Sequence, residues 1–348
     1  MLYAQDVMNT IHTTFNGRLP PYTVVGGKER LAATGLSAVL LNRGRRYTRR
    51  NLFYDLEKTG FDTIISVEPS PPSYDIEELS DRFPFVRFVL LQQPISLGEK
   101  INLAVSELDT PLFFVFWNDL KIIAGGVARR MAERLTRSNG GAGENGESPY
   151  KRLCTVPVIQ TSRFETLPTL MVPALRRKRI RTLFLSPTSE GIPSLYPFDG
   201  VGIYDRERFI RLGGFDETLK SSYWQLMDFG FRAHLWGEEI ASTQTLRFSY
   251  EADVPTEENS GGPDYSRFYL KNLAPIFRGD CASLPLRRFP GFLLRTNGDL
   301  RAAWKDFSKS RSWVYDNRFR WRCDPKAIVK RWDLESAEEN FFPGNGGH

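Results

Sequence analysis

Pro111-Leu-Phe-Phe-Val-Phe-Trp117 is a continuous apolar run that ends abruptly at Asn118-Asp119. A run without alternation predicts a strand covered on both faces, because a strand with one face in water alternates apolar and polar residues. Three shorter runs precede it, separated by helix-like stretches: Leu36–Leu41, Thr63–Val67 and Val86–Leu91. This succession predicts an α/β fold with a doubly wound, mostly parallel central sheet and flanking helices.

The carboxyl ends of these runs carry polar residues. Asn42 and Arg43 follow the first run, and Glu68 follows the second. Asn118 and Asp119 follow the last run. Ligands of open α/β sheets bind just beyond the carboxyl ends of the strands, so we expect these residues to contribute to a binding site.

Histidine and cysteine are scarce in the 348 residues, a length that suits one large domain or two modest ones. The three histidines and three cysteines lie far apart, and no pair has the spacing of a zinc site. A Ser-His-Asp or Cys-His site would have to use His234, because His12 and His348 lie near the ends of the sequence. Isolated cysteines suit a reducing cytosol. We therefore expect any chemistry to use carboxylates, amides and arginines.

Basic residues outnumber acidic ones by 47 to 41, and the pI is near 9.2. Such a surplus suits a phosphate-bearing partner, or is simply a solvated surface. The clusters Arg43–Arg50 and Arg176–Arg181 could face solvent, a diphosphate or a lipid head group. Nucleic-acid binding is the weakest alternative, since no recognised motif is present, and we expect no such partner. Without a signal-peptide pattern or an apolar stretch of about 20 residues, the sequence predicts a cytoplasmic protein, soluble or peripheral to a membrane.

Residues 199–237 hold the densest pattern of helix signals. Asp205 is placed to cap a short helix, which Gly213 and Gly214 would end. A second helix is expected over 222–236. Within it, Gly230 indicates a close approach of backbone or ligand, because glycine is unfavourable inside a helix.

The expected second helix has two distinct faces. Trp224 belongs to an apolar stripe that is typical of a helix packed on a core. Gln225, Asp228 and Arg232 are spaced three and four residues apart, so they share a neighbouring polar face. Asp228 and Arg232 are either an ordinary ion pair or part of a functional site.

Five segments follow one another in an informative order. A strand runs into a polar loop, a glycine-to-asparagine stretch opens a helix, and a hydrophobic strand ends in an acidic residue. A Gly-Gly-Phe-Asp-Glu block and an Asp-x-x-x-Arg helix with a closing glycine come last. The segments are Leu36–Arg43, Leu97–Asn102, Phe113–Asp119, Gly202–Glu217 and Met227–Gly237. This order resembles that of the GT-A glycosyltransferases, in particular the large family 2.

The resemblance spans residues 34–280, which we expect to form a GT-A-like glycosyltransferase domain. It leaves residues 1–33 as an N-terminal extension. Residues 281–330 would be a C-terminal helical extension packed on the domain, and residues 331–348 a flexible tail.

The resemblance implies a glycosyltransferase that moves a sugar from a nucleotide-sugar donor to a glycan or lipid-linked acceptor, as in polysaccharide biosynthesis. It implies inversion with Asp228 as the carboxylate base, and Mg²⁺ or Mn²⁺ held by Asp119 against the departing diphosphate. The implied donor-side residues are Asn42, Arg43, Glu68, Lys100, Asn102, Asn118 and Asp119. The implied acceptor-side residues are Gly213, Gly214, Trp224, Gln225 and Arg232.

The acidic motifs of the family are thinned in this sequence. The acidic triplet is reduced to Asn118-Asp119, and an acidic pair is replaced by Gln225-Leu226. Two interpretations follow. Lys100, Lys121 or the cluster Arg43–Arg50 could neutralise phosphate in place of a metal. Alternatively, the protein is a catalytically degenerate member that binds a nucleotide or a sugar as a scaffold.

Overall fold

The computed structural model describes residues 19–43, 49–69, 75–123, 152–176, 179–251, 254, 262–294 and 299–332. The sequence also indicates a helix near residues 124–137 and a glycine-rich loop at 138–149; both lie outside the described residues. So does nearly all of the tail expected at 331–348.

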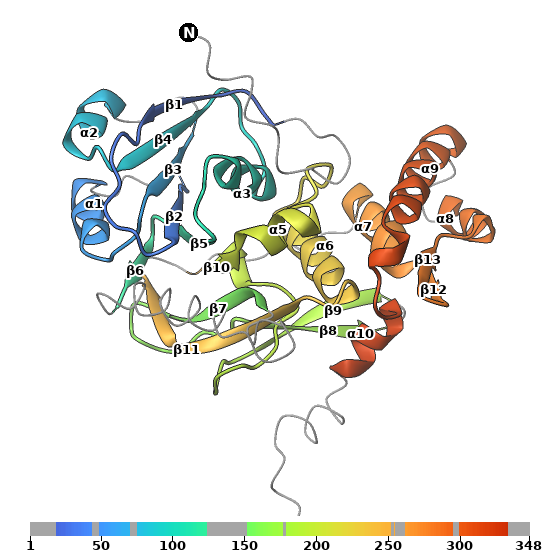
Figure 1. Cartoon of the computed structure of the whole chain (residues 1–348). Helices are drawn as coiled ribbons and strands as arrows, with labels where there is room; N and C mark the ends of the chain where they lie inside the picture. The colour runs from blue at the N-terminus through green and yellow to red at the C-terminus, as the bar shows by residue number, and fades with distance from the viewer. Residues whose placement is uncertain are drawn as a thin grey trace, which may run out of the picture.

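A nine-stranded sheet forms the centre of the molecule, in the order β1-β4-β3-β2-β5-β10-β7-β11-β6 (Figure 1). Its strands are β1 (Tyr22–Gly26), β2 (Leu36–Leu41), β3 (Ile64–Glu68), β4 (Val86–Leu91), β5 (Leu112–Trp117), β6 (Leu120–Ile122), β7 (Arg152–Gln160), β10 (Gly202–Asp205) and β11 (Glu239–Tyr250). The four predicted apolar runs are β2, β3, β4 and β5.

The predicted mostly parallel α/β sheet is confirmed. β4, β3, β2 and β5 are mutually parallel, and β7 is parallel to β11. β10 runs antiparallel between β5 and β7, while β1 and β6 are antiparallel edge strands. Every residue of β2, β3 and β5 is buried, which explains why these runs lack alternation.

Helices cover the sheet, and several begin where the sequence predicts. The helices are α1 (Arg49–Glu57), α2 (Ile76–Arg82), α3 (Leu97–Ser106), α5 (Arg206–Leu212), α6 (Ser222–Leu235), α7 (Pro263–Phe268), α8 (Phe289–Leu293), α9 (Leu300–Asp316) and α10 (Pro325–Arg331). Asp205 caps α5 by accepting from the backbone of Arg208, and Gly213 ends that helix with φ 89°. Ser96 and Glu99 form a capping box at the start of α3.

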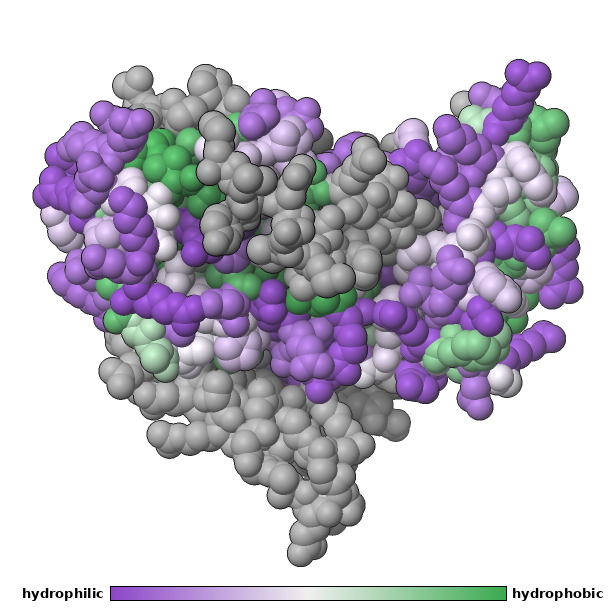
Figure 2. All heavy atoms as spheres, turned by 45° about the horizontal axis from the view of Figure 1, so that its top comes forward, coloured by the Kyte–Doolittle hydropathy of each residue, from purple (hydrophilic) through white to green (hydrophobic). Residues whose placement is uncertain are grey.

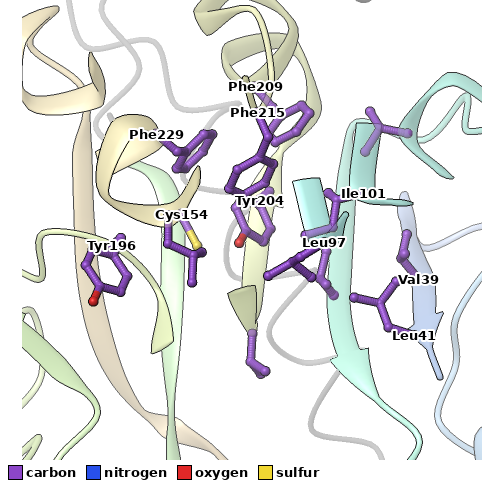
Figure 3. Packing of buried hydrophobic residues seen from close by; sticks show 14 of the residues in the cluster. Val39, Leu41, Leu97, Ile101, Cys154, Tyr196, Tyr204, Phe209, Phe215 and Phe229 are labelled. Carbon is purple, nitrogen blue, oxygen red and sulfur yellow. The ribbon is translucent and has the colours of Figure 1, made fainter. Parts of the chain in front are cut away.

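Aromatic side chains fill the core between the sheet and α5 and α6 (Figure 3). Tyr204 of β10 stacks on Phe113 of β5, with ring centroids 5.0 Å apart. Phe215 and Phe229 stack at 4.5 Å. These contacts fix the Gly-Gly-Phe-Asp-Glu block and α6 against the strands that carry the predicted site.

The segment after β7, which reads as irregular in the sequence, contains a β-hairpin. β8 (Leu170–Arg176) and β9 (Arg179–Leu185) are antiparallel, and the basic cluster Arg176–Arg181 falls at their turn. Charge at the turn hid the strand pattern, because the two apolar stretches lie on either side of it. The turn residues 177–178 are not described.

Residues at both ends of the predicted domain also belong to ordered structure. β1, within the expected N-terminal extension, pairs with β4. The hairpin of β12 (Ile276–Arg278) and β13 (Cys281–Ser283) crosses the boundary expected at residue 280. Trp313 of α9 stacks on Trp236 at 6.0 Å, which joins the C-terminal helices to the end of α6. Among the described residues, no helix is long and apolar enough to cross a membrane.

Candidate functional site

Polar residues that follow the parallel strands meet at one edge of the sheet. Leu41 at the end of β2 lies opposite Val67 of β3 and Trp117 of β5, so the residues after these strands are neighbours. Asn42 Nδ2 donates to the Val67 carbonyl (2.8 Å) and to Glu68 Oε2 (3.0 Å). Two of the predicted donor-side residues therefore contact each other, and both side chains are buried.

Arg43 lies at the centre of this edge. Its guanidinium pairs with Asp119, with 3.5 Å between Nε and Oδ2, and its Nη2 donates to Asp199. The guanidinium carbon lies 4.1 Å from the centroid of the Trp117 ring. Two carboxylates and one aromatic face thus hold a single cation in place. We call the following residues the strand-end cluster: Arg43, Trp117, Asn118, Asp119, Asp199 and Tyr250.

Asp199 is a member of the cluster that sequence reasoning missed. It lies in a short turn, Phe198–Gly200, just before β10, and its φ is 56°. Its side chain accepts from the Tyr250 hydroxyl (3.0 Å), and its carbonyl accepts from Trp117 Nε1 (2.9 Å). A non-glycine residue in the left-handed region costs free energy and often marks a functional position. The one available sequence signal was the Asp-Gly pair directly before a strand.

Two further groups lie near Arg43. One is the amine of Lys100 on α3, and the other is the side-chain amide of Asn118, directly after β5. Lys100 Nζ lies 5.9 Å from the centroid of the Trp117 ring. Burial, and then the charge of Arg43, hold the pKa of the Lys100 amine below its ordinary value. Asn118 Oδ1 accepts from the Arg43 backbone (3.3 Å), whereas its buried Nδ2 has no hydrogen-bond partner in the described part of the chain. Buried donors are rarely left unpaired, so Nδ2 is a candidate donor to a ligand.

The carboxylates of the strand-end cluster do not form an open metal site. Asp119 and Asp199 both contact Arg43, which occupies the position of the cation between them. Across the described ranges, no three His, Cys, Asp or Glu side chains lie close enough together to hold a metal ion. Mg²⁺ and Mn²⁺ favour several oxygen ligands. As arranged, the residues do not fit the divalent metal that the resemblance implies at Asp119.

Asp228, the predicted base, is fully buried on α6. Its carboxylate accepts from Arg232 Nε (2.7 Å), Lys271 Nζ (3.1 Å) and Asn272 Nδ2 (2.7 Å). Lys271 also pairs with Asp216, at 3.0 Å. We call these five residues the buried ion-pair network. Burial raises the pKa of Asp228, but Arg232 and Lys271 outweigh that effect and hold the pKa below its ordinary value.

This environment bears on the role expected for Asp228. A general base must reach the proton that it removes, and its pKa must suit proton transfer. A sealed carboxylate that neutralises two buried cations meets neither condition. Its contacts favour a structural role.

Arg232 ties the buried network to the Gly-Gly turn. Its Nη1 donates to the Leu212 carbonyl (2.7 Å) and its Nη2 to the Gly214 carbonyl (2.6 Å). Gly213 and Gly214 have φ values of 89° and 62°, in the left-handed region that favours glycine. A Cβ on Gly214 would lie 2.4 Å from Asn102 Oδ1. The two glycines and Arg232, predicted on the acceptor side, therefore hold a turn in place.

Asn102 and Gln225 also bind backbone. Asn102 accepts from the Phe215 N–H (2.9 Å) and donates to the Phe215 carbonyl (2.8 Å). Gln225 accepts from the Gly98 N–H (2.8 Å) and donates to the Leu219 carbonyl (2.8 Å). Both amides are buried, and they join α3 to the block that precedes α6. Their geometry favours structural roles over the predicted donor-side and acceptor-side roles.

Packing explains the remaining residues singled out on α6. Trp224 is buried and lies 5.3 Å from Phe268 and 5.1 Å from Tyr265, measured between ring centroids. A Cβ on Gly230 would lie 2.2 Å from the Leu195 carbonyl oxygen, so the close approach predicted there is one of backbone. His234 contacts the Ser194 carbonyl at 3.0 Å, as expected of a buried structural histidine.

The sheet order, the helices and the polar cluster at the strand ends define a GT-A fold. Among solved structures, the chain is similar to GalNAc-T7 crystallised with UDP, GalNAc and Mn²⁺, with a TM-score of 0.54 and 12% identity. That match covers 88% of this chain, which spans 58% of the GalNAc-T7 chain. At this identity the likeness shows the fold alone.

Two further structures are less similar. One is TarS of S. aureus, with a TM-score of 0.46 and 10% identity over 85% of this chain and 55% of that one. The other is the mannosyltransferase PcManGT from Pyrobaculum calidifontis with GDP-Man and Mn²⁺. Its TM-score is 0.40 and its identity 9%, over 93% of this chain and 91% of that one. No family model matches the sequence, and no curated protein is similar to it.

Proposed function

We propose that this chain is a glycosyltransferase that moves a sugar from a nucleotide-sugar donor to a glycan or lipid-linked acceptor, as in polysaccharide biosynthesis. The observation that carries the proposal is Arg43, stacked on Trp117 and held between Asp119 and Asp199 beyond the parallel strands. A departing nucleoside diphosphate develops negative charge, which a preorganised guanidinium stabilises. The GT-A neighbour GalNAc-T7 is crystallised with UDP and GalNAc.

In this proposal, three groups bind the donor diphosphate. Arg43 offers a planar fork that matches two phosphate oxygens. Lys100 adds a second cation near Trp117, with its Nζ 5.9 Å from the ring centroid. Burial, and then the charge of Arg43, lower the pKa of its amine, and a bound phosphate would favour the charged form. The unpartnered Asn118 Nδ2 supplies a neutral donor.

The acceptor-activating carboxylate is assigned to the strand-end cluster, where Asp119 and Asp199 lie. Diphosphate competes with both carboxylates for the guanidinium of Arg43. Donor binding would therefore release a carboxylate next to the sugar, where it can accept the proton of the acceptor hydroxyl. Inversion would require this carboxylate to act on the face of the sugar opposite the departing diphosphate, so the anomeric configuration of the product tests the assignment.

The same arrangement supports transfer without a divalent metal, because Arg43 already supplies positive charge between the two carboxylates. This is a difference from GalNAc-T7, which is crystallised with Mn²⁺. Metal dependence is thus a direct test of which cation serves this site.

The test is calorimetric titration with UDP and GDP, followed by transfer and hydrolysis assays over a panel of nucleotide sugars, with EDTA or with Mn²⁺. We expect a diphosphate to bind in EDTA, and Arg43→Met to weaken that binding about tenfold or more. Arg50→Met is the matched control, because Arg50 is an exposed arginine of α1 paired with Glu78. Absence of both binding and turnover across the panel contradicts the proposal. Binding without turnover supports the non-catalytic scaffold.

A further inference from the structure

Positive charge is concentrated in the C-terminal part of the sequence. Residues 281–332 hold 13 lysines and arginines against four aspartates, a surplus of nine. Residues 1–280 are nearly neutral, with 34 basic and 33 acidic residues. The basic pI therefore originates mainly in α8, α9, α10 and their connections, which lie to one side of the sheet in Figure 1.

α9 presents apolar side chains to solvent on one face. Its buried residues Ala303, Phe307, Ser310, Trp313 and Val314 face the protein. Leu300, Trp304 and Tyr315 are 59%, 49% and 62% exposed. Their spacings of four and eleven residues place them on one stripe of the helix. Among the described residues, Phe289 of α8 packs against Trp304 (ring centroids 5.1 Å apart) and Arg318 lies over Tyr315, yet all three stripe side chains keep the exposures given above.

Aromatic and basic groups alternate at the end of α9. Phe319, three residues beyond α9, is 64% exposed. The Arg318 guanidinium carbon lies 3.9 Å from the Tyr315 ring centroid and 4.5 Å from that of Phe319. Exposed basic residues accompany the stripe: Arg311 lies on it, Arg301 lies beside it, Lys305 and Lys309 lie further around the helix, and Arg320 lies beyond its end. Figure 2 shows apolar atoms next to strongly hydrophilic ones on this side of the molecule.

We propose that this surface of α9 and the residues that follow it docks onto an anionic lipid bilayer. We call it the α9 surface, and it consists of Leu300, Arg301, Trp304, Arg311, Tyr315, Arg318 and Phe319. Basic residues are attracted to acidic head groups, and exposed aromatic and leucine side chains enter the head-group region. A polyanion such as nucleic acid would use the charge and could stack a base on Tyr315, but it would leave Leu300 in water. The apolar stripe therefore selects the bilayer.

The proposal does not depend on glycosyltransferase activity, since vesicle binding is measured without donor or acceptor. It also concerns residues other than the strand-end cluster. If binding to vesicles fails while nucleoside diphosphate binding succeeds, only this inference is lost. The reverse result removes only the proposed function.

The experiment is co-sedimentation of the full chain with vesicles of phosphatidylcholine, with or without about 30% phosphatidylglycerol. We expect binding to the anionic vesicles only, weakening as salt increases. Arg301→Gln with Arg311→Gln should reduce binding by about tenfold or more, because each basic residue near an anionic surface contributes about fivefold. Tyr315→Ser with Phe319→Ser should also reduce binding several-fold.

Two control variants separate the surface from general effects. Lys28→Gln with Lys58→Gln removes the same charge from exposed positions elsewhere. Phe164→Ser removes an aromatic side chain that is 67% exposed outside the α9 surface. Both controls should sediment as the unmodified chain does. Brominated lipid should quench the fluorescence of the unmodified chain more than that of Trp304→Phe.

Several results would overturn the inference. The clearest is equal binding to neutral and anionic vesicles, or none to either. Full binding by the Tyr315 and Phe319 variant, with loss only in the Arg301 and Arg311 variant, would show a purely electrostatic surface. Tighter binding of a mixed-sequence oligonucleotide than of anionic vesicles would assign the surface to a polyanion.

Discussion

Two groups of carboxylates in this molecule each hold a cation, yet they differ in their access to solvent. In the strand-end cluster, the side chains of Arg43 and Asp199 are 19% and 15% exposed. In the buried ion-pair network, those of Asp228 and Arg232 are fully buried. A ligand can compete for Arg43, whereas Arg232 is sealed among its partners. Ion pairing alone therefore does not identify a site; exposure decides which pair a ligand can reach.

The largest effect should come from Asp228→Ala. It leaves Arg232 and Lys271 buried without their carboxylate, and breaking a buried pair costs about 3–5 kcal/mol. We expect the urea midpoint of unfolding to fall accordingly, while the folded fraction still binds nucleoside diphosphate. Asp228→Asn, which keeps the shape, should lose less stability. Unchanged stability together with loss of transfer would return Asp228 to the role of base.

Arg43→Met should show the opposite pattern. Loss of one preorganised donor to a developing oxyanion lowers kcat by about 10²–10³. Arg43 is partly exposed, so the free energy of unfolding should change by less than about 1 kcal/mol. Arg43→Lys should recover part of the rate, because it restores charge without the planar fork. A large loss of stability without a specific loss of donor binding would make Arg43 a structural residue.

The sequence predicted the fold because hydrophobic pattern and helix signals agreed. Continuous burial of β2 and β5 produced runs without alternation, and Asp205 and Gly213 bounded α5 as predicted. The hairpin of β8 and β9 was missed, because its turn is a basic cluster that resembles a solvated loop.

The site was only partly predictable. Asn42, Arg43, Asn118 and Asp119 lie at the strand ends, where topology alone places them. Asp199 joins them through a turn 80 residues further along the chain than Asp119, and no periodic pattern records that contact. For Asp228, sequence spacing showed the partner Arg232 but not Lys271 and Asn272, which reach it from the π-helix Tyr269–Leu273. Burial, which decides its role, follows from packing rather than from spacing.

Gly230→Ala tests how closely α6 packs against the backbone at Leu195. In an exposed helix, this change adds about 1 kcal/mol of stability. Here the new Cβ would meet the Leu195 carbonyl, so we expect a loss of about 1–3 kcal/mol by urea unfolding. An increase in stability would show that α6 can move away from the Leu195 backbone at little cost.

The smallest effect is the contribution of Asp228 to the acid limb of the stability curve. Its pKa in the folded protein lies below its ordinary value, because Arg232 and Lys271 outweigh burial. Such a group stabilises the fold above its unfolded pKa of about 3.9 and loses that contribution as the pH falls through its folded pKa. The free energy of unfolding, measured with urea in steps from pH 6 downward, should therefore fall more steeply below about pH 4 for the unmodified chain than for Asp228→Asn. The amide cannot titrate, so two parallel curves would mean that the carboxylate is equally protonated in both states. That result would contradict a network in which Asp228 is the charged partner of two buried cations, and it would remove the physical distinction drawn between this network and the strand-end cluster.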